Sequence, residues 1–254
     1  MKNAYSELAA FYDRLNGEVD YNAWSAFLIS LLEEHGIGKG STLLDAGCGT
    51  GQITVRLAKA GYDMIGVDLS PEMLSLARAL SESESVSPLF LCQDISEIDL
   101  YGTVRAAIST LDSLNYLTKK EAFESFFSRI RNFIEPGGLL IFDLNTKYKF
   151  ERVYGDNDYI LEDDGVFCGW SNHYSASTRL ASFSLSIFER LQNGDYARRD
   201  EYQQERFYPD STVKKLLDRF GFDLVAMYSD IDRTPADPSR GSADLRRFFV
   251  CKKR

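Results

Sequence analysis

Histidine and cysteine, the residue types that build most metal clusters and crosslinked frameworks, are rare in this chain. Its 254 residues include two histidines and four cysteines. The cysteines lie far apart and form no Cys-X-X-Cys pair, so the sequence indicates neither a disulfide framework nor a zinc site. We therefore expect free thiols, a reducing compartment and no bound metal.

Long hydrophobic runs are missing as well. No apolar stretch approaches the ~20 residues that a membrane-spanning helix needs. The N-terminal segment, residues 1–7, has no apolar core of the kind found in a signal peptide. We therefore expect a cytoplasmic protein with no membrane partner.

Positively charged residues are also few in comparison with negatively charged ones. The chain has 29 lysines and arginines against 38 aspartates and glutamates, which gives a formal net charge of -9 and a pI of about 4.9. A nucleic-acid backbone would meet net repulsion, which makes a nucleic-acid partner unfavourable. The one basic cluster lies at the C-terminus and is expected to be a solvated strand edge and tail: Arg246, Arg247, Lys252, Lys253 and Arg254. We expect a small-molecule partner and a monomer or homodimer.

What the chain does contain is an ordinary globular composition arranged in an alternating order. Hydrophobic residues make up 44% and charged residues 26%, so the whole chain is expected to fold. Short apolar runs alternate with helical stripes, which indicates a parallel sheet with helices on both faces. The expected strands are 43–45, 64–68, 89–92, 106–109 and 139–143, followed near the C-terminus by the pair 222–228 and 245–251.

Local signals predict where several helices begin. Apolar residues at helical spacing predict a helix over 22–35. Ser70 before Pro71 is typical of a helix start, and residues 118–121 have the pattern of a capping box. Asp210 is expected to cap the last helix.

The order changes after residue 143. Residues 165–208 have period-two character, in which Phe183, Leu185 and Ile187 alternate with serines. Asn193-Gly194 is a hairpin signal within this segment. The segment is therefore expected to form an antiparallel meander inserted into the α/β order.

A glycine-rich loop follows the first expected strand, in the run Leu43-Leu44-Asp45-Ala46-Gly47-Cys48-Gly49-Thr50-Gly51-Gln52. Glycines let a ligand approach the backbone closely and permit left-handed torsions. The dinucleotide fingerprint G-x-G-x-x-G/A needs a small residue where Gln52 stands. The loop therefore predicts a nucleotide-like ligand, and Gln52 disfavours NAD.

Three aspartates stand at the ends of three successive expected strands. Asp45 precedes the glycine loop, Asp68 ends the second strand, and Asp94 follows the third. Ligands of an open α/β sheet bind at the carboxyl ends of its strands. Each aspartate alone is better explained as a helix cap or turn residue. Together with the glycine loop, the three predict an adenosyl-type ligand.

The glycine loop with Asp45 before it resembles motif I of the class I S-adenosylmethionine-dependent methyltransferases. The resemblance implies a Rossmann-like, mostly parallel seven-stranded sheet with a closing antiparallel hairpin, and S-adenosylmethionine as the cofactor. It implies that Asp45 receives the ammonium group, Asp68 the ribose hydroxyls and Asp94 the adenine amino group. The other implied cofactor contacts are Tyr12 and Tyr21 as a cover, and Gly47, Gly49, Leu69, Met73, Ile95 and Leu111.

Further segments resemble one small bacterial subgroup of that family, in which an antiparallel β segment is inserted. They are residues 5–15 and 20–24, the run from Leu111 to Tyr116, Trp170, and the Glu205-Arg206 pair. The resemblance implies four parts: an N-terminal helical cover (1–36), an S-adenosylmethionine-binding core (37–150), an antiparallel β insertion that acts as a substrate lid (151–209), and a segment that completes the core sheet (210–254).

The acceptor side of the site leaves alternatives open. The run 109–116 carries neither the Asn/Asp-Pro-Pro-Tyr motif of nucleic-acid amino methylation nor a Pro-Cys nucleophile, which disfavours a nucleobase acceptor. The candidate residues are Asp112, Asn115 and Tyr116 at the fourth strand end, and Trp170, His173, Tyr174, Arg206 and Tyr208 in the insertion. Turn and capping roles explain the first three nearly as well, and packing of the meander onto the core is the favoured explanation for each of the five insertion residues.

We therefore expect a methyltransferase that acts on a small molecule. The alternatives are a methyltransferase acting on tRNA or protein, a non-catalytic regulatory protein that binds S-adenosylmethionine or S-adenosylhomocysteine, and an NAD-dependent oxidoreductase. A positive face near the strand ends would favour the first alternative. The absence of an acceptor cavity would favour the second, and nicotinamide binding the third.

Overall fold

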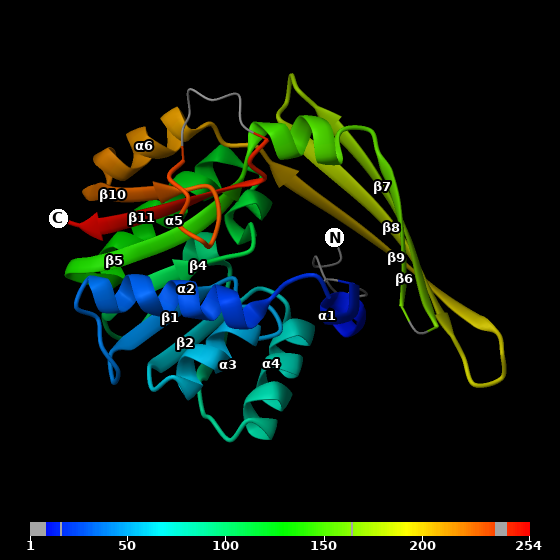
Figure 1. The fold of residues 1–254 in the computed structure, drawn as a ribbon, viewed down its shortest axis with the longest axis horizontal. Helices are drawn as coiled ribbons and strands as arrows, with labels where there is room; N and C mark the ends of the chain where they lie inside the picture. The colour runs from blue at the N-terminus through cyan, green and yellow to red at the C-terminus, as the bar shows by residue number, and fades with distance from the viewer. Residues whose placement is uncertain (1–8, 16, 164, 237–242) are drawn as a thin grey trace.

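A central seven-stranded sheet forms the core of the computed structural model, which describes residues 9–15, 17–163, 165–236 and 243–254. Its strand order is β10-β11-β5-β4-β1-β2-β3 (Figure 1). The strands are β1 (Thr42–Ala46), β2 (Asp63–Asp68), β3 (Leu89–Cys92), β4 (Val104–Ser109), β5 (Ile134–Asn145), β10 (Phe222–Tyr228) and β11 (Arg246–Lys253). Strands β1 to β5 pair in parallel, and β11 runs antiparallel to both β5 and β10. The predicted sheet with its closing antiparallel hairpin is confirmed.

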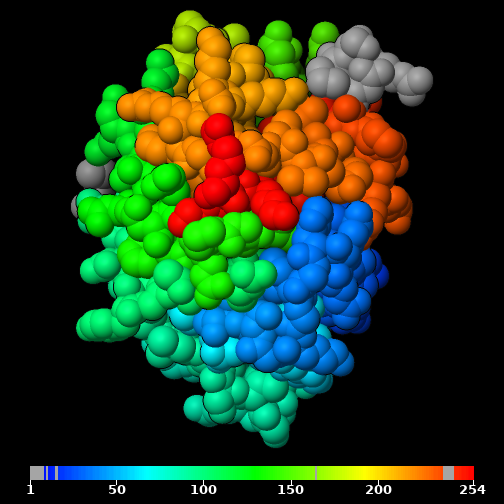
Figure 2. Space-filling view, turned by 90° about the vertical axis from the view of Figure 1, so that its left-hand side faces the viewer, coloured from blue at the N-terminus to red at the C-terminus, as the bar shows by residue number. Residues whose placement is uncertain are grey.

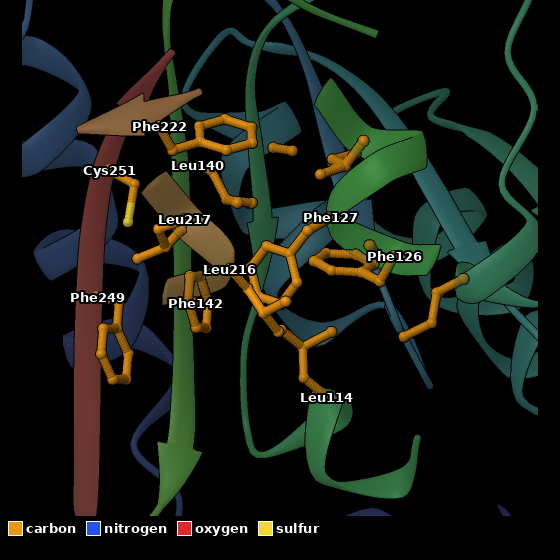
Figure 3. Close-up of a cluster of buried hydrophobic side chains, with 14 of the residues drawn as sticks. Leu114, Phe126, Phe127, Leu140, Phe142, Leu216, Leu217, Phe222, Phe249 and Cys251 are labelled. Atoms are coloured by element: carbon orange, nitrogen blue, oxygen red, sulfur yellow. The ribbon is translucent and has the colours of Figure 1, made fainter. Parts of the chain in front are cut away.

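Helices cover both faces of this sheet. Leu43 packs in a core with α2 (Tyr21–Glu34) and α3 (Gln52–Lys59), whereas Leu44 packs in the opposite core with α5 (Lys120–Phe133) and α6 (Asp210–Arg219). Neighbouring strand residues point to opposite faces, which explains this division. Figure 3 shows the second core, where the rings of Phe142 and Phe249 stack with centroids 4.9 Å apart. Because both faces are covered, a ligand reaches the sheet at its strand ends.

A second sheet stands beyond the carboxyl ends of the parallel strands (Figure 1). Its antiparallel strands are β6 (Asp158–Asp163), β7 (Val166–Ser175), β8 (Leu180–Arg190) and β9 (Tyr196–Arg206), in the order β6-β7-β8-β9. Asn193 and Gly194 lie in the turn between β8 and β9, and Gly194 has a φ of 89° there. The expected antiparallel meander with its hairpin is therefore confirmed.

The side of the molecule remote from the second sheet is closed by contacts between distant segments. Figure 2 shows α2, in blue, beside the segment that follows β10, in orange. Arg233 of that segment lies 2.7 Å from Glu34 and donates a hydrogen bond to Ser30 Oγ at 2.6 Å. The open strand ends are therefore on the opposite side, toward the second sheet.

Two of the remaining helix starts are fixed by side-chain caps. Ser70 Oγ accepts from the Met73 amide at 3.2 Å and caps α4 (Pro71–Ser83), as expected. Asp20 accepts from two backbone amides at the start of α2, so this helix begins one residue before the expected Asn22. Within the described residues, no helix is both long and apolar enough to span a membrane.

Two expected caps are wrong. The helix α5 begins at Lys120 without a side-chain cap, because the segment before it is held by tertiary contacts: Arg206 donates to the Thr118 carbonyl. Asp210 is the first residue of α6, and Pro209 in an extended conformation occupies the capping position. In both cases the residues that precede the helix, and not a side-chain cap, determine where the helix begins.

The C-terminal basic cluster is solvated only in part: Lys252 and Arg254 are exposed, as expected, whereas Arg246 is partly buried and Arg247 is buried. Strand β11 lies between β10 and β5, inside the sheet. Arg246 lies 2.6 Å from Asp112 and 2.6 Å from Asp143, and the side chain of Arg247 is 9% exposed and lies 2.7 Å from Asp244. Carboxylates from other elements therefore neutralise these arginines inside the fold. All four cysteines are free thiols, as expected.

Candidate functional site

A cavity of about 630 Å³ opens at the carboxyl ends of β1, β2, β3 and β4 and extends to β9. The residues on the side of the central sheet are Asp45, Gly47, Cys48, Gly49, Thr50, Gln52, Ile53, Asp68, Leu69, Ser70, Met73, Asp94, Ile95, Thr110, Leu111 and Ser113. The remaining walls are formed by Tyr12, Tyr21, Tyr116, Leu117, Thr118 and the β9 residues Asp200, Glu201, Tyr202, Gln203 and Gln204. The glycine loop and the second sheet thus face one space.

The glycine loop has the left-handed torsions that its sequence suggests. Gly47 and Gly49 have φ values of 85° and 53°. A Cβ atom at Gly47 would lie 2.7 Å from the side chain of Ser113, whereas one at Gly49 would meet nothing within 4 Å. Gly47 is therefore required by the packing of the protein itself, and Gly49 leaves space at the backbone for a ligand.

The first of the three strand-end aspartates, Asp45, is 1% exposed. It accepts a hydrogen bond from Thr54 Oγ1 at 2.6 Å. Burial raises the pKa of its carboxyl to about 7. The hydrogen bond from Thr54 opposes this shift, and the negative charge of Asp68 adds to it. A cationic group of a ligand would favour the ionised form of this carboxylate.

The other two aspartates combine a local structural role with a place on the cavity wall. Asp68 accepts from the amides of Gly49 and Ser70, each at 2.9 Å. Burial raises the pKa of Asp68, and these backbone hydrogen bonds oppose the shift. Asp94 accepts from the amide of Ser96 at 2.8 Å and caps a short 3₁₀ helix, η2 (Ile95–Glu97). Capping and ligand contact are therefore compatible at these positions.

An N-terminal element, α1 (Tyr12–Leu15), lies over the glycine loop. Asp13 accepts from Thr50 Oγ1 at 2.9 Å and from Gln52 Nε2 at 2.8 Å. Gln52, which replaces the last glycine of the dinucleotide fingerprint, is thus used to hold this cover. The predicted cover residues Tyr12 and Tyr21 line the cavity beside it.

The same element contacts the second sheet. Arg14 Nε donates to the Asp163 carboxylate of β6 at 2.9 Å. Adjacent residues of α1 therefore bind the core and the insertion. Neither Asp13 nor Arg14 belongs to a local motif, so no sequence pattern marks them as linking residues.

The structure does not bring the residues proposed to contact the methyl acceptor together at the cavity. Only Tyr116 lines the cavity, and its hydroxyl donates to Gln203 Oε1 at 3.3 Å. The other candidates, which are Asp112, Asn115, Trp170, His173, Tyr174, Arg206 and Tyr208, are not among the described lining residues. Their position agrees with the turn, capping and packing alternatives for these residues.

The insertion candidates have structural roles instead. His173 is exposed and lies 2.6 Å from Asp156, on the far side of the sheet from its apolar core. Trp170 packs edge-on against Phe183 with ring centroids 5.8 Å apart. Arg206 donates to the carbonyl groups of Thr118 and Thr178, which fixes the end of β9 against the core. Tyr174 packs against Phe150, and Tyr208 stacks on Phe123.

Asp112 and Asn115 belong to a buried polar network between the two sheets. Asn115 donates to the Arg206 carbonyl at 2.8 Å and accepts from the Asn145 amide at 3.0 Å. Burial acts to raise the pKa of Asp112, but the positive charge of Arg246 outweighs this effect and holds the pKa below its usual value. Glu205 of β9 accepts from Asn145 Nδ2 at 2.8 Å, and burial, with the charge of Asp112, raises its pKa to about 8.

No sequence pattern marks the β9 wall of the cavity. Glu201, Gln203 and Glu205 are buried at alternate positions, while Tyr202 is exposed. Residues 198–206 are polar or aromatic at outward as well as inward positions, so the sequence shows no period of two here. Inward strand positions are usually apolar, which gave no reason to expect buried polar side chains.

The acceptor groups at the strand ends suit S-adenosylmethionine. Three carboxylates at the strand ends match one ammonium group, the ribose hydroxyls and one amino group, and Leu69 and Met73 provide apolar surface. No lysine, arginine or histidine occurs among the described residues that line the cavity. The wall is therefore better matched to a ligand with cationic and hydroxyl groups than to a diphosphate.

Comparison with known proteins agrees with this geometry. A family model described as a methyltransferase domain matches residues 43–138, which include the glycine loop and all three strand-end aspartates. Two relatives that carry the word methyltransferase in their names align over 98% of this chain. One is GWCH70_2453 of Geobacillus sp. (strain WCH70), 33% identical over 99% of its length. The other is YqeM of Bacillus subtilis (strain 168), 34% identical over 97% of its length.

A solved structure extends the similarity to the second sheet. It is an S-adenosylmethionine-dependent methyltransferase from Clostridium acetobutylicum ATCC 824, 31% identical, with a TM-score of 0.87 and 99% of each chain covered. The similarity therefore includes the insertion and the closing strands as well as the glycine loop. This protein belongs to the S-adenosylmethionine-dependent methyltransferases.

Proposed function

We propose that this methyltransferase acts on a small molecule that binds between the glycine loop and β9. The observation that carries the proposal is the single cavity whose wall includes both Gly49 and Gln203. Its volume of about 630 Å³ is in the ~300–1,000 Å³ range of small-molecule sites. A protein that only bound the cofactor would need the wall that contains Gly49 and would not need the β9 wall that contains Gln203.

The strand ends are proposed to hold the cofactor. Asp45 would receive its ammonium group, Asp68 its ribose hydroxyls and Asp94 its adenine amino group. Leu69 and Met73 would border the adenine. When bound, S-adenosylmethionine supplies a methyl group on a positively charged sulfur and leaves as a neutral thioether.

The contribution of the protein itself is position and the exclusion of water. Tyr12 and Tyr21 lie on one wall, and the β9 residues lie on another, so the acceptor would be enclosed between them. Correct placement of two reactants can supply ~7–11 kcal/mol of the barrier at best. We accordingly assign residues 151–209 the role of a lid and residues 1–36 that of a cover.

The charge of the wall argues against the macromolecular alternative. A methyltransferase acting on tRNA needs cations near the transfer site to bind phosphates. The described lining residues include five carboxylates, Asp45, Asp68, Asp94, Asp200 and Glu201, and no cation. A small acceptor therefore fits this site better than an RNA backbone.

The proposal is tested by incubating the protein with S-adenosylmethionine labelled in its methyl group and an extract of bacterial cells. The extract is then separated into small-molecule, protein and RNA fractions. We expect protein-dependent label in the small-molecule fraction. Label in protein or RNA would contradict the small-molecule acceptor, and cofactor binding without any transfer would favour the non-catalytic alternative.

A further inference from the structure

Strand β9 is an edge strand of the second sheet, and its edge forms one wall of the cavity. Among the described strands it pairs with β8 alone. Five consecutive β9 residues, 200–204, line the cavity. Consecutive side chains of a strand point to opposite faces of the sheet, so a cavity that touches all five residues runs along the backbone edge that they share. The cavity wall at β9 therefore includes backbone groups as well as side chains.

The outward-facing side chains of β9 are engaged away from the cavity. The Tyr202 hydroxyl and Gln204 Nε2 each donate to Ser182 Oγ at 3.0 Å. Asp200 Oδ1 accepts from Ser186 Oγ at 2.8 Å. Both serines lie on the face of β8 that is opposite to its apolar cluster. The residues 200, 202 and 204 therefore meet the cavity through their backbone.

The register of the β8–β9 pair shows which backbone groups of β9 point to this edge. In an antiparallel pair, residues bonded to the partner strand alternate with residues whose backbone groups point away from it. At one end of the pair the Leu191 amide donates to the Asp195 carbonyl at 2.8 Å, and at the other end the Phe207 amide donates to the Arg179 carbonyl at 2.9 Å. Odd-numbered β9 residues therefore bond to β8, and even-numbered residues point their N–H and C=O groups to the edge.

The end of β9 agrees with this direction. The carbonyl of Arg206, an even-numbered residue, accepts from Asn115 Nδ2 at 2.8 Å, which joins the edge to the core. The N–H and C=O of Tyr202 have no hydrogen-bond partner in the part of the chain that the structure describes. A ligand that fills the cavity and displaces water must therefore supply partners for them, because buried backbone groups are almost always paired.

A side chain beside this edge has an unused donor. Gln203 is 5% exposed and lines the cavity. Its Oε1 accepts from the Tyr116 hydroxyl at 3.3 Å, whereas its Nε2 is buried and has no hydrogen-bond partner among the described residues. Buried amide groups are normally satisfied, so a partner with an acceptor atom is missing. This side chain and the backbone edge independently require hydrogen-bonding groups on the ligand.

We propose that the methyl acceptor is a small molecule that contains a peptide unit, such as an N-acylated amino acid or a short peptide. The N–H and C=O of one residue of the acceptor pair with the C=O and N–H of Tyr202, as when a strand is added to a sheet edge. A further carbonyl oxygen of the acceptor accepts from Gln203 Nε2. An apolar group in this place would leave the edge unpaired, which costs free energy once water is displaced. This inference rests on the proposed function and specifies its substrate class.

The test compares two probes of nearly the same shape. One is N-acetylglycine N-methylamide, and the other is the ester in which an oxygen atom replaces the N–H of its glycine unit. Their binding to the protein saturated with S-adenosylhomocysteine is measured by ligand-observed NMR at neutral pH. We expect the amide to bind about tenfold more tightly, because the ester cannot donate to the Tyr202 carbonyl and places an oxygen against it.

Two pairs of variants locate the contacts. Tyr202→Pro removes an N–H that points to the edge and so removes no bond between β8 and β9. Its control is Tyr202→Ala, which loses the same side chain and keeps this N–H. We expect the amide probe to bind about tenfold more weakly to Tyr202→Pro than to Tyr202→Ala. Gln203→Met should weaken both probes several-fold, whereas Gln192→Met, the same change at an exposed position between β8 and β9, should weaken neither.

Thermal unfolding of each variant with S-adenosylhomocysteine checks that it is folded and binds this ligand. If Tyr202→Pro does not fold, the comparison of amide with ester and the Gln203→Met variant decide the question.

The outcomes separate the two proposals. A wild-type protein that binds amide and ester equally, or binds neither, overturns the peptide inference and leaves the methyl transfer to a small molecule standing. The same holds if folded Tyr202→Pro binds the amide as tightly as Tyr202→Ala does, or if Gln203→Met binds both probes normally. Loss of S-adenosylhomocysteine binding in the wild-type protein would instead contradict the proposed function.

Discussion

At the residue scale, Asp45 connects the electrostatics of the site to its ligand. Its buried carboxyl has a pKa raised to about 7, so near neutral pH it changes between a neutral and a charged form. At a pH below this pKa, Asp45 is protonated in the free protein and must lose its proton before it can bind an ammonium group, which costs binding free energy. At a pH above this pKa, Asp45 is already ionised in the free protein, so binding carries no such cost.

We therefore expect the affinity for S-adenosylmethionine to rise with pH up to about pH 7 and to level off above it, with a slope of at most ~tenfold per pH unit. Calorimetric titration between pH 5.5 and 8 measures this profile. In Asp45→Asn the affinity should be weaker and the rise should disappear. A wild-type affinity that is flat over this range would show that Asp45 does not receive the ammonium group.

Two glycines of the same loop make a matched pair. A side chain at Gly49 enters open space, whereas one at Gly47 meets Ser113 at 2.7 Å. Gly49→Ala should abolish detectable cofactor binding and cost only about 1–2 kcal/mol of stability, since its φ of 53° is unfavourable for alanine. Gly47→Ala should lose more stability.

Thermal unfolding and S-adenosylhomocysteine titration of both glycine variants test this difference. Unchanged binding in Gly49→Ala would show that the loop backbone does not contact the ligand. Because a side chain at Gly47 would also collide with Ser113, a substitution at Gly49 tests contact between the loop and the ligand more directly.

At the element scale, sequence signals located the strands well and the second-sheet wall poorly. The strands 89–92 and 222–228 were predicted with the bounds that the structure has, because apolar runs and flanking turns mark them. The strand-end aspartates followed from the same pattern. Gln203 and Asp13 act through contacts with distant elements, and no local pattern marks such contacts. The division of the chain into four parts remains a prediction.

The short α1 element gives a prediction of its own. Asp13 binds Thr50 and Gln52 of the loop, and we expect Asp13→Ala to weaken S-adenosylmethionine binding about tenfold, or ~1.4 kcal/mol, because the cover is released. Glu18→Ala, a change at an exposed position between α1 and α2, is the control and should bind normally. Equal affinities of the two variants would mean that the cover contributes nothing to binding.

At the scale of the whole molecule, a buried ionic network joins the two sheets. Arg246 of β11 binds Asp112 and Asp143, while Asn145 connects this group to Glu205 of β9. The sequence suggested a solvated C-terminal cluster because its arginines are close together at the chain end. The partners of Arg246 are Asp112 and Asp143, which only the fold brings near.

Removal of one partner from such a network leaves buried carboxylates unpaired. We expect Arg246→Ala to lower the free energy of unfolding by about 3–5 kcal/mol. Arg254→Ala breaks an exposed pair with Asp218 and should cost less than about 1 kcal/mol. Denaturant unfolding of both variants at neutral pH makes the comparison, and equal losses would contradict a stabilising role for the buried pairing.

The central claim is that the strand-end cavity binds an adenosyl-sulfur ligand and leaves room for an acceptor. Calorimetric titration of the protein with S-adenosylmethionine, S-adenosylhomocysteine and NAD, in parallel, tests its first half most directly. We predict saturable binding of the two adenosyl-sulfur ligands with a stoichiometry of one per chain, and no binding of NAD. Binding of NAD alone would contradict the account of the glycine loop and of the three aspartates.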